Sequence, residues 1–390
     1  MKICFFYHQV FRHGGIQRVL ATLVNEMSKN HECWIVCTQP IENLPNPYSL
    51  NTDRINIVYL NIDYVEDNKK ISINIRRRFY GTGSWFLHEE SKNKVIKFIN
   101  ENKFDCVIGC MLEYNILLSS IKDHINCRII GWEHNSFYSY VNYSGGSRIG
   151  KLVHSIRKII NYQFIKKHLK KLDDFVVLTK EEQRIYTKLF DINALIISNP
   201  LCIAVKGNNR SMLFSKIILT IGRLEEIKGA DMLGDIISGF CAKNEDWKFK
   251  IIGEGPIKSH IMKRLVNENI RDRVVFENFK ENILEEYISG SIYLCPSRFE
   301  SFGLTVLEAL AYGLPVVSFN TSGPKEIVEG YNCGEIIPNY QIDEMIEGLI
   351  DLVSKDEKRE IYSLNAIERA KSFEIQTVIE KWNSLLSKSI

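Results

Sequence analysis

Residues 297–319, SRFESFGLTVLEALAYGLPVVSF, carry the most informative pattern in this chain of 390 residues. Apolar spacing predicts a helix over 304–312 and a strand over 315–319. Between positions 300 and 325 the only charged side chain is that of Glu308, within the apolar helix. Because burying a lone carboxylate is costly, we expect Glu308 to accept hydrogen bonds from a specific partner.

The start of this predicted helix is suited to an anion. Gly303 permits a sharp turn into the helix, so that the N–H groups of Gly303 and Leu304 form an anion site. A ribose diol could supply hydroxyl donors to Glu308, whereas neighbouring backbone N–H groups are the structural alternative. Glu300 lies in the preceding loop, where a glutamate is usually only solvated, but we expect it to point toward the same helix end.

Two cations follow a strand earlier in the chain. In ILTIGRLEEIKGADML, residues 218–233, the predicted strand ends at Gly222, and Arg223 and Lys228 follow in the loop. At the carboxyl edge of a parallel sheet, such a pair can neutralise a diphosphate, Arg by its planar fork and Lys as a point charge. Taken alone, this spacing favours two unrelated surface cations.

Three further segments carry weaker signals. Gly14-Gly15, in HGGIQRV, lies between a strand and a helix and permits close approach of a phosphate, although Gly-Gly turns are common. His134, in GWEHNSF, follows a strand, where a lone histidine is more often structural than catalytic. Gly253 and Gly255, in IIGEGP, by themselves indicate a turn.

Strands and helices alternate along the chain. We predict strands at 2–7, 32–37, 55–60, 104–110, 127–131, 175–178, 195–198, 217–222, 248–252, 274–276, 292–295 and 315–319. Helices are predicted between most of them, including 16–27, 231–241, 257–267, 304–312 and 343–354. This alternation is typical of βαβ units with parallel sheets. Asn199-Pro200 and the irregular residues 201–215 mark a boundary, so we predict two Rossmann-like α/β domains, 1–200 and 201–374, facing a central cleft.

The composition is that of a globular protein, with 45% hydrophobic and 25% charged residues. No stretch is long and apolar enough for a transmembrane helix, and the first residues, MKICFFYHQV, lack the features of a signal peptide. Ten cysteines occur without a C-x-x-C pair, which favours reduced, buried thiols. We therefore expect a cytoplasmic protein.

The positive charge is concentrated in the first half. Residues 1–200 hold 27 Lys and Arg against 19 Asp and Glu, a net +8, whereas the remainder holds 23 against 28, a net −5. The segments 69–78 and 151–171 contain basic residues and no acid. An anionic membrane surface would suit them, and a solvated helix face is the alternative. Nucleic acid is disfavoured, since no nucleic-acid motif occurs.

Together these segments resemble the retaining glycosyltransferase family 4, whose fold is GT-B. The resemblance extends from Gly14-Gly15 to the last helix with Trp382. Its most specific elements are E-x7-E at 300–308 and G-R-L-x-x-x-K-G at 222–229, and residues 253–256 and 198–200 also match. One departure is SGPKEIV at 322–328, where some members have a Gly-Gly pair; we assign it no role.

The resemblance implies roles for residues of the second domain. Arg223 and Lys228 would bind the donor diphosphate, and Glu308 would bind the nucleotide ribose. Glu300 would contact the transferred sugar.

The resemblance also assigns backbone groups and the first domain. Gly303 and Leu304 would offer N–H groups to the phosphates, and Gly253 would belong to the donor site. Gly15 would close over the donor from the first domain, and His134 would lie near the reacting sugar. The catalytic set is therefore Glu300, His134, Arg223 and Lys228. The last helix, 375–390, would pack back on the acceptor-binding first domain.

The predicted reaction follows from the charge that develops on the leaving nucleoside diphosphate. Arg223, Lys228 and the helix N-terminus would stabilise that charge, and the chain contains no Asp-x-Asp, so we expect no metal. From the family, retention implies front-face attack, with the departing phosphate oxygen taking the acceptor proton. We expect a hexosyltransferase that uses a UDP-sugar and a lipid-linked oligosaccharide or surface-polysaccharide acceptor, such as lipopolysaccharide or capsule. It would act in the cytoplasm or on the inner membrane face.

Three alternatives compete with this interpretation. A sugar-nucleotide epimerase of the same fold would turn over the donor without an acceptor. A dinucleotide-dependent oxidoreductase would need G-x-G-x-x-G after a strand, which the chain lacks. A catalytically dead sugar-nucleotide-binding scaffold is disfavoured because Glu300, Glu308, Arg223 and Lys228 are all present.

Overall fold

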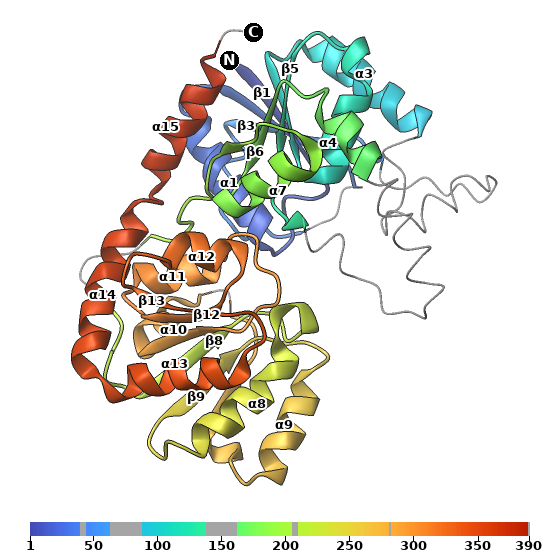
Figure 1. The fold of residues 1–390 in the computed structure, drawn as a ribbon. Helices are drawn as coiled ribbons and strands as arrows, with labels where there is room; N and C mark the ends of the chain where they lie inside the picture. The colour runs from blue at the N-terminus through green and yellow to red at the C-terminus, as the bar shows by residue number, and fades with distance from the viewer. Residues whose placement is uncertain (40–43, 63–87, 138–161, 205–209, 281, 389–390) are drawn as a thin grey trace, which may run out of the picture. The chain divides into compact units, whose positions relative to one another are not determined.

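The computed structural model describes residues 1–39, 44–62, 88–137, 162–204, 210–280 and 282–388. The chain divides into two compact units (Figure 1). Unit 1 comprises Met1–Pro200 with Val378–Ile390, and unit 2 comprises Leu201–Thr377. The chain thus passes from one unit to the other at Pro200, inside the Asn-Pro break, and returns within the last helix.

Unit 1 is built on a parallel sheet in the order β3-β2-β1-β4-β5-β6-β7. The strands are β1 Lys2–Tyr7, β2 Glu32–Cys37, β3 Ile55–Tyr59, β4 Cys106–Cys110, β5 Arg128–Trp132, β6 Asp174–Val177 and β7 Leu195–Ile196. Among the described residues of this unit, the helical elements are α1 Gly15–Met27, α3 Glu89–Asn102, α4 Leu112–Ser120, η2 Lys122–His124, α7 Lys180–Phe190 and α15 Ile375–Leu386. The central strands β4 and β5 are buried throughout, as expected for a sheet covered on both faces.

Unit 2 has a parallel sheet in the order β10-β9-β8-β11-β12-β13. Its strands are β8 Ile217–Ile221, β9 Lys248–Ile252, β10 Val274–Glu277, β11 Ile292–Cys295, β12 Val316–Phe319 and β13 Gly334–Ile337. Its helical elements are η3 Glu226–Lys228, α8 Ala230–Cys241, α9 Lys258–Asn267, η4 Arg271–Arg273, α10 Leu284–Ser289, α11 Leu304–Ala311, α12 Ser322–Val328, α13 Ile342–Ser354 and α14 Asp356–Lys371. A core of buried apolar side chains joins this sheet to α8, α9 and α13.

The order of strands in unit 2 reverses between β8 and β11. At such a switch point the connections leave in opposite directions, and the carboxyl ends of the two strands border the crevice where ligands of α/β proteins bind. The loops that follow these strands are residues 222–229 and 296–303. They are the segments that the sequence singles out for their chemistry.

The prediction of two α/β domains with parallel sheets is confirmed. The predicted strands and helices are present, with ends that differ by a few residues. Sequence patterns missed β13 and the helices α10, α12 and α14. The ten cysteines, all among the described residues, form no disulfide, and nine of them are buried. The basic segment 69–78 and residues 151–161 of the second basic segment lie outside the described residues. None of the described helices has the length and apolarity that a membrane span requires.

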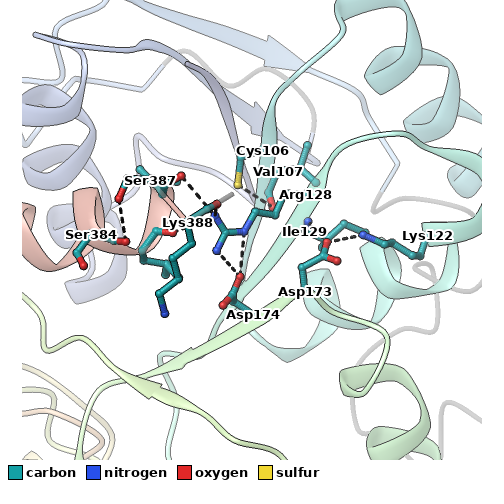
Figure 2. Close-up of polar contacts among 12 residues, drawn as sticks. Cys106, Val107, Lys122, Arg128, Ile129, Asp173, Asp174, Ser384, Ser387 and Lys388 are labelled. Carbon is teal, nitrogen blue, oxygen red and sulfur yellow. Dashed lines mark hydrogen bonds and ion pairs between the residues drawn. The ribbon is translucent and has the colours of Figure 1, made fainter. Parts of the chain in front are cut away.

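Arg128 fastens the last helix to unit 1 (Figure 2). From the start of β5, its buried guanidinium donates from Nη1 to the carbonyl oxygens of Leu385, at 2.9 Å, and Lys388, at 3.1 Å. Its Nε and Nη2 donate to Oδ2 of Asp174, at 2.9 and 2.6 Å. Because the last carbonyls of a helix have no partner within it, Arg128 satisfies the end of α15 while Asp174 balances the charge.

Replacing Arg128 should therefore loosen the last helix. Arg128→Ala leaves the mostly buried Asp174 carboxylate without its partner, so we expect the free energy of unfolding to fall by about 3 kcal/mol. Hydrogen exchange should accelerate in residues 378–388. Lys170→Ala, which removes an exposed ion pair with Asp191 in the same unit, is the control and should change little. Equal effects of the two substitutions would contradict this role of Arg128.

Candidate functional site

The loop that follows β8 lies directly against the loop that follows β11. Gly229 has a φ of 70°, and a Cβ there would lie 1.8 Å from the carbonyl oxygen of Pro296. Only glycine permits this approach, because it lacks a Cβ and tolerates positive φ. The contact positions Lys228, the last residue of η3, next to the loop that carries Glu300.

Arg298 ties the same two loops together. Its guanidinium pairs with Asp231 of α8, at 2.6 Å between Nη2 and Oδ2, and Nη1 donates to the carbonyl oxygen of Glu226 at 3.0 Å. Its backbone N–H donates to the carbonyl oxygen of Ile227 at 3.1 Å. The hydrogen bonds with Asp231 raise the pKa of Arg298 against the opposing effect of burial. No sequence pattern points to Arg298, since nothing in the spacing of residues 231 and 298 relates them.

Lys228 and Glu300 form an ion pair at the switch point. Lys228 Nζ lies 2.6 Å from Glu300 Oε2, and the two side chains are 30% and 14% exposed. The hydroxyl of Ser297 donates to the same oxygen at 3.5 Å. Burial works to lower the pKa of Lys228, but the charge and hydrogen bond of Glu300 outweigh it, so the pKa lies above its ordinary value. The ammonium is therefore charged at neutral pH.

Arg223 is the second predicted cation of this loop. Its side chain is 68% exposed, and Nη1 lies 2.9 Å from Oε1 of Glu225. Its positive charge is near enough to lower the pKa of Lys228, in opposition to the effect of Glu300. The structure thus brings Arg223 and Lys228 together, as the sequence predicts. It also gives each of them a carboxylate neighbour, which the sequence does not predict.

The N-terminus of α11 adjoins the ion pair. Gly303 precedes the helix with a φ of 86°, and no side chain caps the first turn, where Leu304 is the first residue. The first amide groups of a helix have no acceptor within it and carry its partial positive charge. A Cβ at Gly303 would lie 3.3 Å from Cγ of Glu300, so the Glu300 side chain passes beside this helix end.

Glu308 lies one helical turn further, and its side chain is almost completely buried, with 1% of the residue exposed. The hydroxyl of Tyr287, from α10, donates to Glu308 Oε2 at 2.8 Å. Tyr312 stacks on the Tyr287 ring, with centroids 5.8 Å apart. The expected hydrogen-bond donor is therefore present, and it is a tyrosine hydroxyl. Ribose binding by Glu308 stays a prediction.

Gly253 has a packing role of its own. With a φ of 144°, it approaches the loop after β8 so closely that a Cβ would lie 1.9 Å from the carbonyl oxygen of Gly222. Gly255 approaches Leu224 in the same way. The turn that the sequence predicts here is thus needed to pack two loops of unit 2. The assignment of Gly253 to the donor site stays a prediction.

Gly15 and His134 belong to unit 1, whereas the other predicted site residues belong to unit 2. Gly15 is the first residue of α1, and the N–H of Gly14 donates to the hydroxyl of Tyr48 at 2.7 Å. His134 follows β5 and is 3% exposed, with its ring centroid 4.0 Å from that of Trp132. Neither ring nitrogen of His134 has a hydrogen-bond partner among the described residues.

Burial lowers the pKa of His134 from 6.5 to about 3. The imidazole is therefore neutral at physiological pH. It can donate one hydrogen bond and accept another, but it does not carry the proton that a general acid would deliver.

Comparisons with known proteins are consistent with this geometry. Residues 208–369 match the family model described as glycosyl transferases group 1. An uncharacterized glycosyltransferase of Haemophilus influenzae is 28% identical over 389 residues, 99% of each chain. The poly(ribitol-phosphate) alpha-N-acetylglucosaminyltransferase of Staphylococcus aureus is 27% identical over 58% of this chain and 46% of its own.

Among solved structures, S. aureus TarM with Fondaparinux, alpha-GlcNAc-glycerol and UDP superposes with a TM-score of 0.75 at 16% identity, covering both chains completely. WaaG, a glycosyltransferase involved in lipopolysaccharide biosynthesis, gives 0.68 at 14% identity and covers 99% of this chain and 100% of its own. The fold is that of GT-B glycosyltransferases, and together the matches support a glycosyltransferase. The epimerase alternative finds no support among these relatives.

The lowered pKa of His134 predicts how stability depends on pH. Between about pH 6.5 and pH 3 the unfolded chain protonates this histidine while the folded chain does not, so acidification destabilises the fold. The free energy of unfolding should fall by up to about 1.4 kcal/mol for each pH unit of acidification. His134→Gln should remove this part of the slope, as measured by urea unfolding from pH 7 to pH 4.

His260→Gln, at an exposed position of α9, is the control for loss of an imidazole. If wild type and His134→Gln lost stability in parallel on acidification, the buried neutral imidazole would be excluded.

Proposed function

We propose that this protein is a hexosyltransferase that moves a sugar from a UDP-sugar to a glycan or lipid-linked oligosaccharide acceptor, with retention of configuration and without a metal ion. The observation that carries the proposal is the cluster of Arg223 and Lys228 beside the start of α11, at the switch point of unit 2. A diphosphate leaving group is the ligand whose charge and shape suit this cluster.

The charge of the site acts on the step in which the glycosidic bond breaks. Negative charge then grows on the β-phosphate oxygen, and preorganised cations and helix amides lower the energy of that state. We assign this role to Arg223, Lys228 and the N–H groups of Gly303 and Leu304. These two cations and the helix end are the positive groups that would face the diphosphate, and we propose that they act without a metal ion.

The two glutamates bind hydroxyl groups of the donor. Glu308 accepts from the ribose diol, and Tyr287 orients its carboxylate through the 2.8 Å hydrogen bond. Glu300 accepts from hydroxyls of the transferred sugar. Gly253 belongs to the wall of the donor site.

The transfer proceeds by front-face attack. The bond between the anomeric carbon and the phosphate oxygen breaks, the acceptor oxygen bonds to that carbon on the same face, and the departing oxygen takes the acceptor proton. Because burial lowers the pKa of His134 to about 3, its neutral imidazole is a weak base, so it positions a sugar hydroxyl by a hydrogen bond and takes no proton in this step.

The names of relatives support the acceptor class. They include an amylovoran biosynthesis glycosyltransferase of Erwinia amylovora and a lipopolysaccharide core biosynthesis mannosyltransferase of Rhizobium meliloti. Both names are those of biosynthetic glycosyltransferases, and the second acts in lipopolysaccharide core biosynthesis, which supports a lipopolysaccharide-type or capsule-type acceptor for this chain. An epimerase would release an altered nucleotide sugar in the absence of any acceptor.

Donor binding tests the central claim. In buffer with EDTA, titration calorimetry with UDP-, GDP- and ADP-sugars should detect binding, strongest for a UDP-sugar. Lys228→Ala should weaken it at least about tenfold, because a charge-assisted hydrogen bond to phosphate is lost. Glu308→Ala should also weaken it, whereas Lys358→Ala, in α14, is a control without effect. Binding that requires magnesium, or no binding at all, would refute the proposal.

The net +8 of residues 1–200 supports a location on the inner face of a membrane, held by anionic lipids. We expect the protein to cosediment with vesicles that contain phosphatidylglycerol, and to dissociate as salt is raised. Substituting Arg76, Arg77 and Arg78 by Gln should weaken this binding. Substituting Lys216, Lys243 and Lys248 by Gln removes the same charge from unit 2 and serves as control. Equal binding to uncharged vesicles would contradict the electrostatic attachment.

A further inference from the structure

Lys228 and Glu300 hold each other in place from two separate loops. Lys228 is the last residue of η3, and Gly229 fixes that loop against Pro296. The backbone of Glu300 is held from the other side, since its carbonyl oxygen accepts the N–H of Gly323 at 2.9 Å.

A diphosphate that binds Lys228 therefore comes close to a carboxylate. The ammonium has several N–H donors and can bond to both groups, but the two anions repel each other. This repulsion is substantial because the pair is mostly shielded from water, with Glu300 14% exposed and Lys228 30% exposed.

An intact nucleotide sugar offsets this repulsion, whereas the product does not. Hydroxyls of the bound sugar donate to the Glu300 carboxylate and stabilise its charge beside the phosphates. After transfer the nucleoside diphosphate carries no sugar, so Glu300 faces the phosphates without those donors and competes for Lys228.

We propose that Glu300 is a specificity residue that makes the site favour the intact donor over the nucleoside diphosphate product, and so promotes product release by re-forming its ion pair with Lys228. The inference rests on the proposed function and adds a second task for the same carboxylate. Arg223 and Glu225 form a similar pair, but Arg223 is 68% exposed, so solvent screens that pair and it discriminates little.

Glu300→Gln tests the inference, because the amide keeps the shape of the side chain and removes its charge. Titration calorimetry in EDTA would use UDP, GDP, ADP and inorganic pyrophosphate as probes, and a UDP-sugar as the intact donor. We expect the variant to bind the preferred nucleoside diphosphate about fivefold more tightly than wild type. The affinity for the UDP-sugar should rise by a smaller factor, so the preference for donor over product should fall.

Glu335→Gln is the matched control. Glu335 of β13 pairs with Lys358 at 2.5 Å, and these side chains are 30% and 27% exposed, so the variant loses the same charge from a similar ion pair of unit 2. It should bind nucleoside diphosphates as wild type does. In a Lys228→Ala background, Glu300→Gln should tighten binding less than it does in wild type, because the competition for the ammonium is gone and only the repulsion between carboxylate and phosphates is relieved; a purely structural role would give no such coupling.

The outcomes separate the two claims. If wild type binds a nucleoside diphosphate and a folded Glu300→Gln variant binds it equally or more weakly, the competition is overturned and the proposed function stands. If Glu335→Gln tightens binding as much as Glu300→Gln does, the effect is one of net charge and the inference is also overturned. If neither wild type nor Glu300→Gln binds any probe, both the proposed function and the inference fail.

Discussion

The contact between the loops after β8 and β11 is the constraint on which the candidate site depends. Gly229 lies against the carbonyl oxygen of Pro296, and the Arg298–Asp231 pair fastens the same loops. These loops leave adjacent strands at the one place where the strand order of unit 2 reverses. Cations from the first loop and a carboxylate and a helix end from the second therefore meet in a small volume.

Much of the fold could be predicted from the sequence, because it depends on local periodicity. Alternating apolar strands and amphipathic helices gave two parallel α/β domains, and Asn199-Pro200 lies where the chain leaves unit 1. The last helix was harder, since its attachment depends on a distant residue. Arg128 reaches carbonyl groups more than 250 residues further along, and no local pattern specifies such a partner.

The site was predictable in its residue types and less so in its pairings. The lone charge of Glu308 within an apolar helix required a partner, and one exists, but no spacing could identify Tyr287. The sequence likewise placed Arg223 and Lys228 in one loop without the carboxylates beside them. Periodicity determines which face a side chain occupies, whereas ion pairs depend on how separate loops pack.

These pairings change how the cationic cluster should be understood. A cluster of unopposed cations would bind any polyphosphate and would hold the product as firmly as the substrate. Catalysis gains only from interactions that strengthen in the transition state, and uniform binding gives no acceleration. With Glu300 bound to Lys228, the full positive charge becomes available only to a ligand that also satisfies the carboxylate. On the proposed function, this partly buried ion pair converts general attraction for phosphate into preference for a phosphate that carries a sugar.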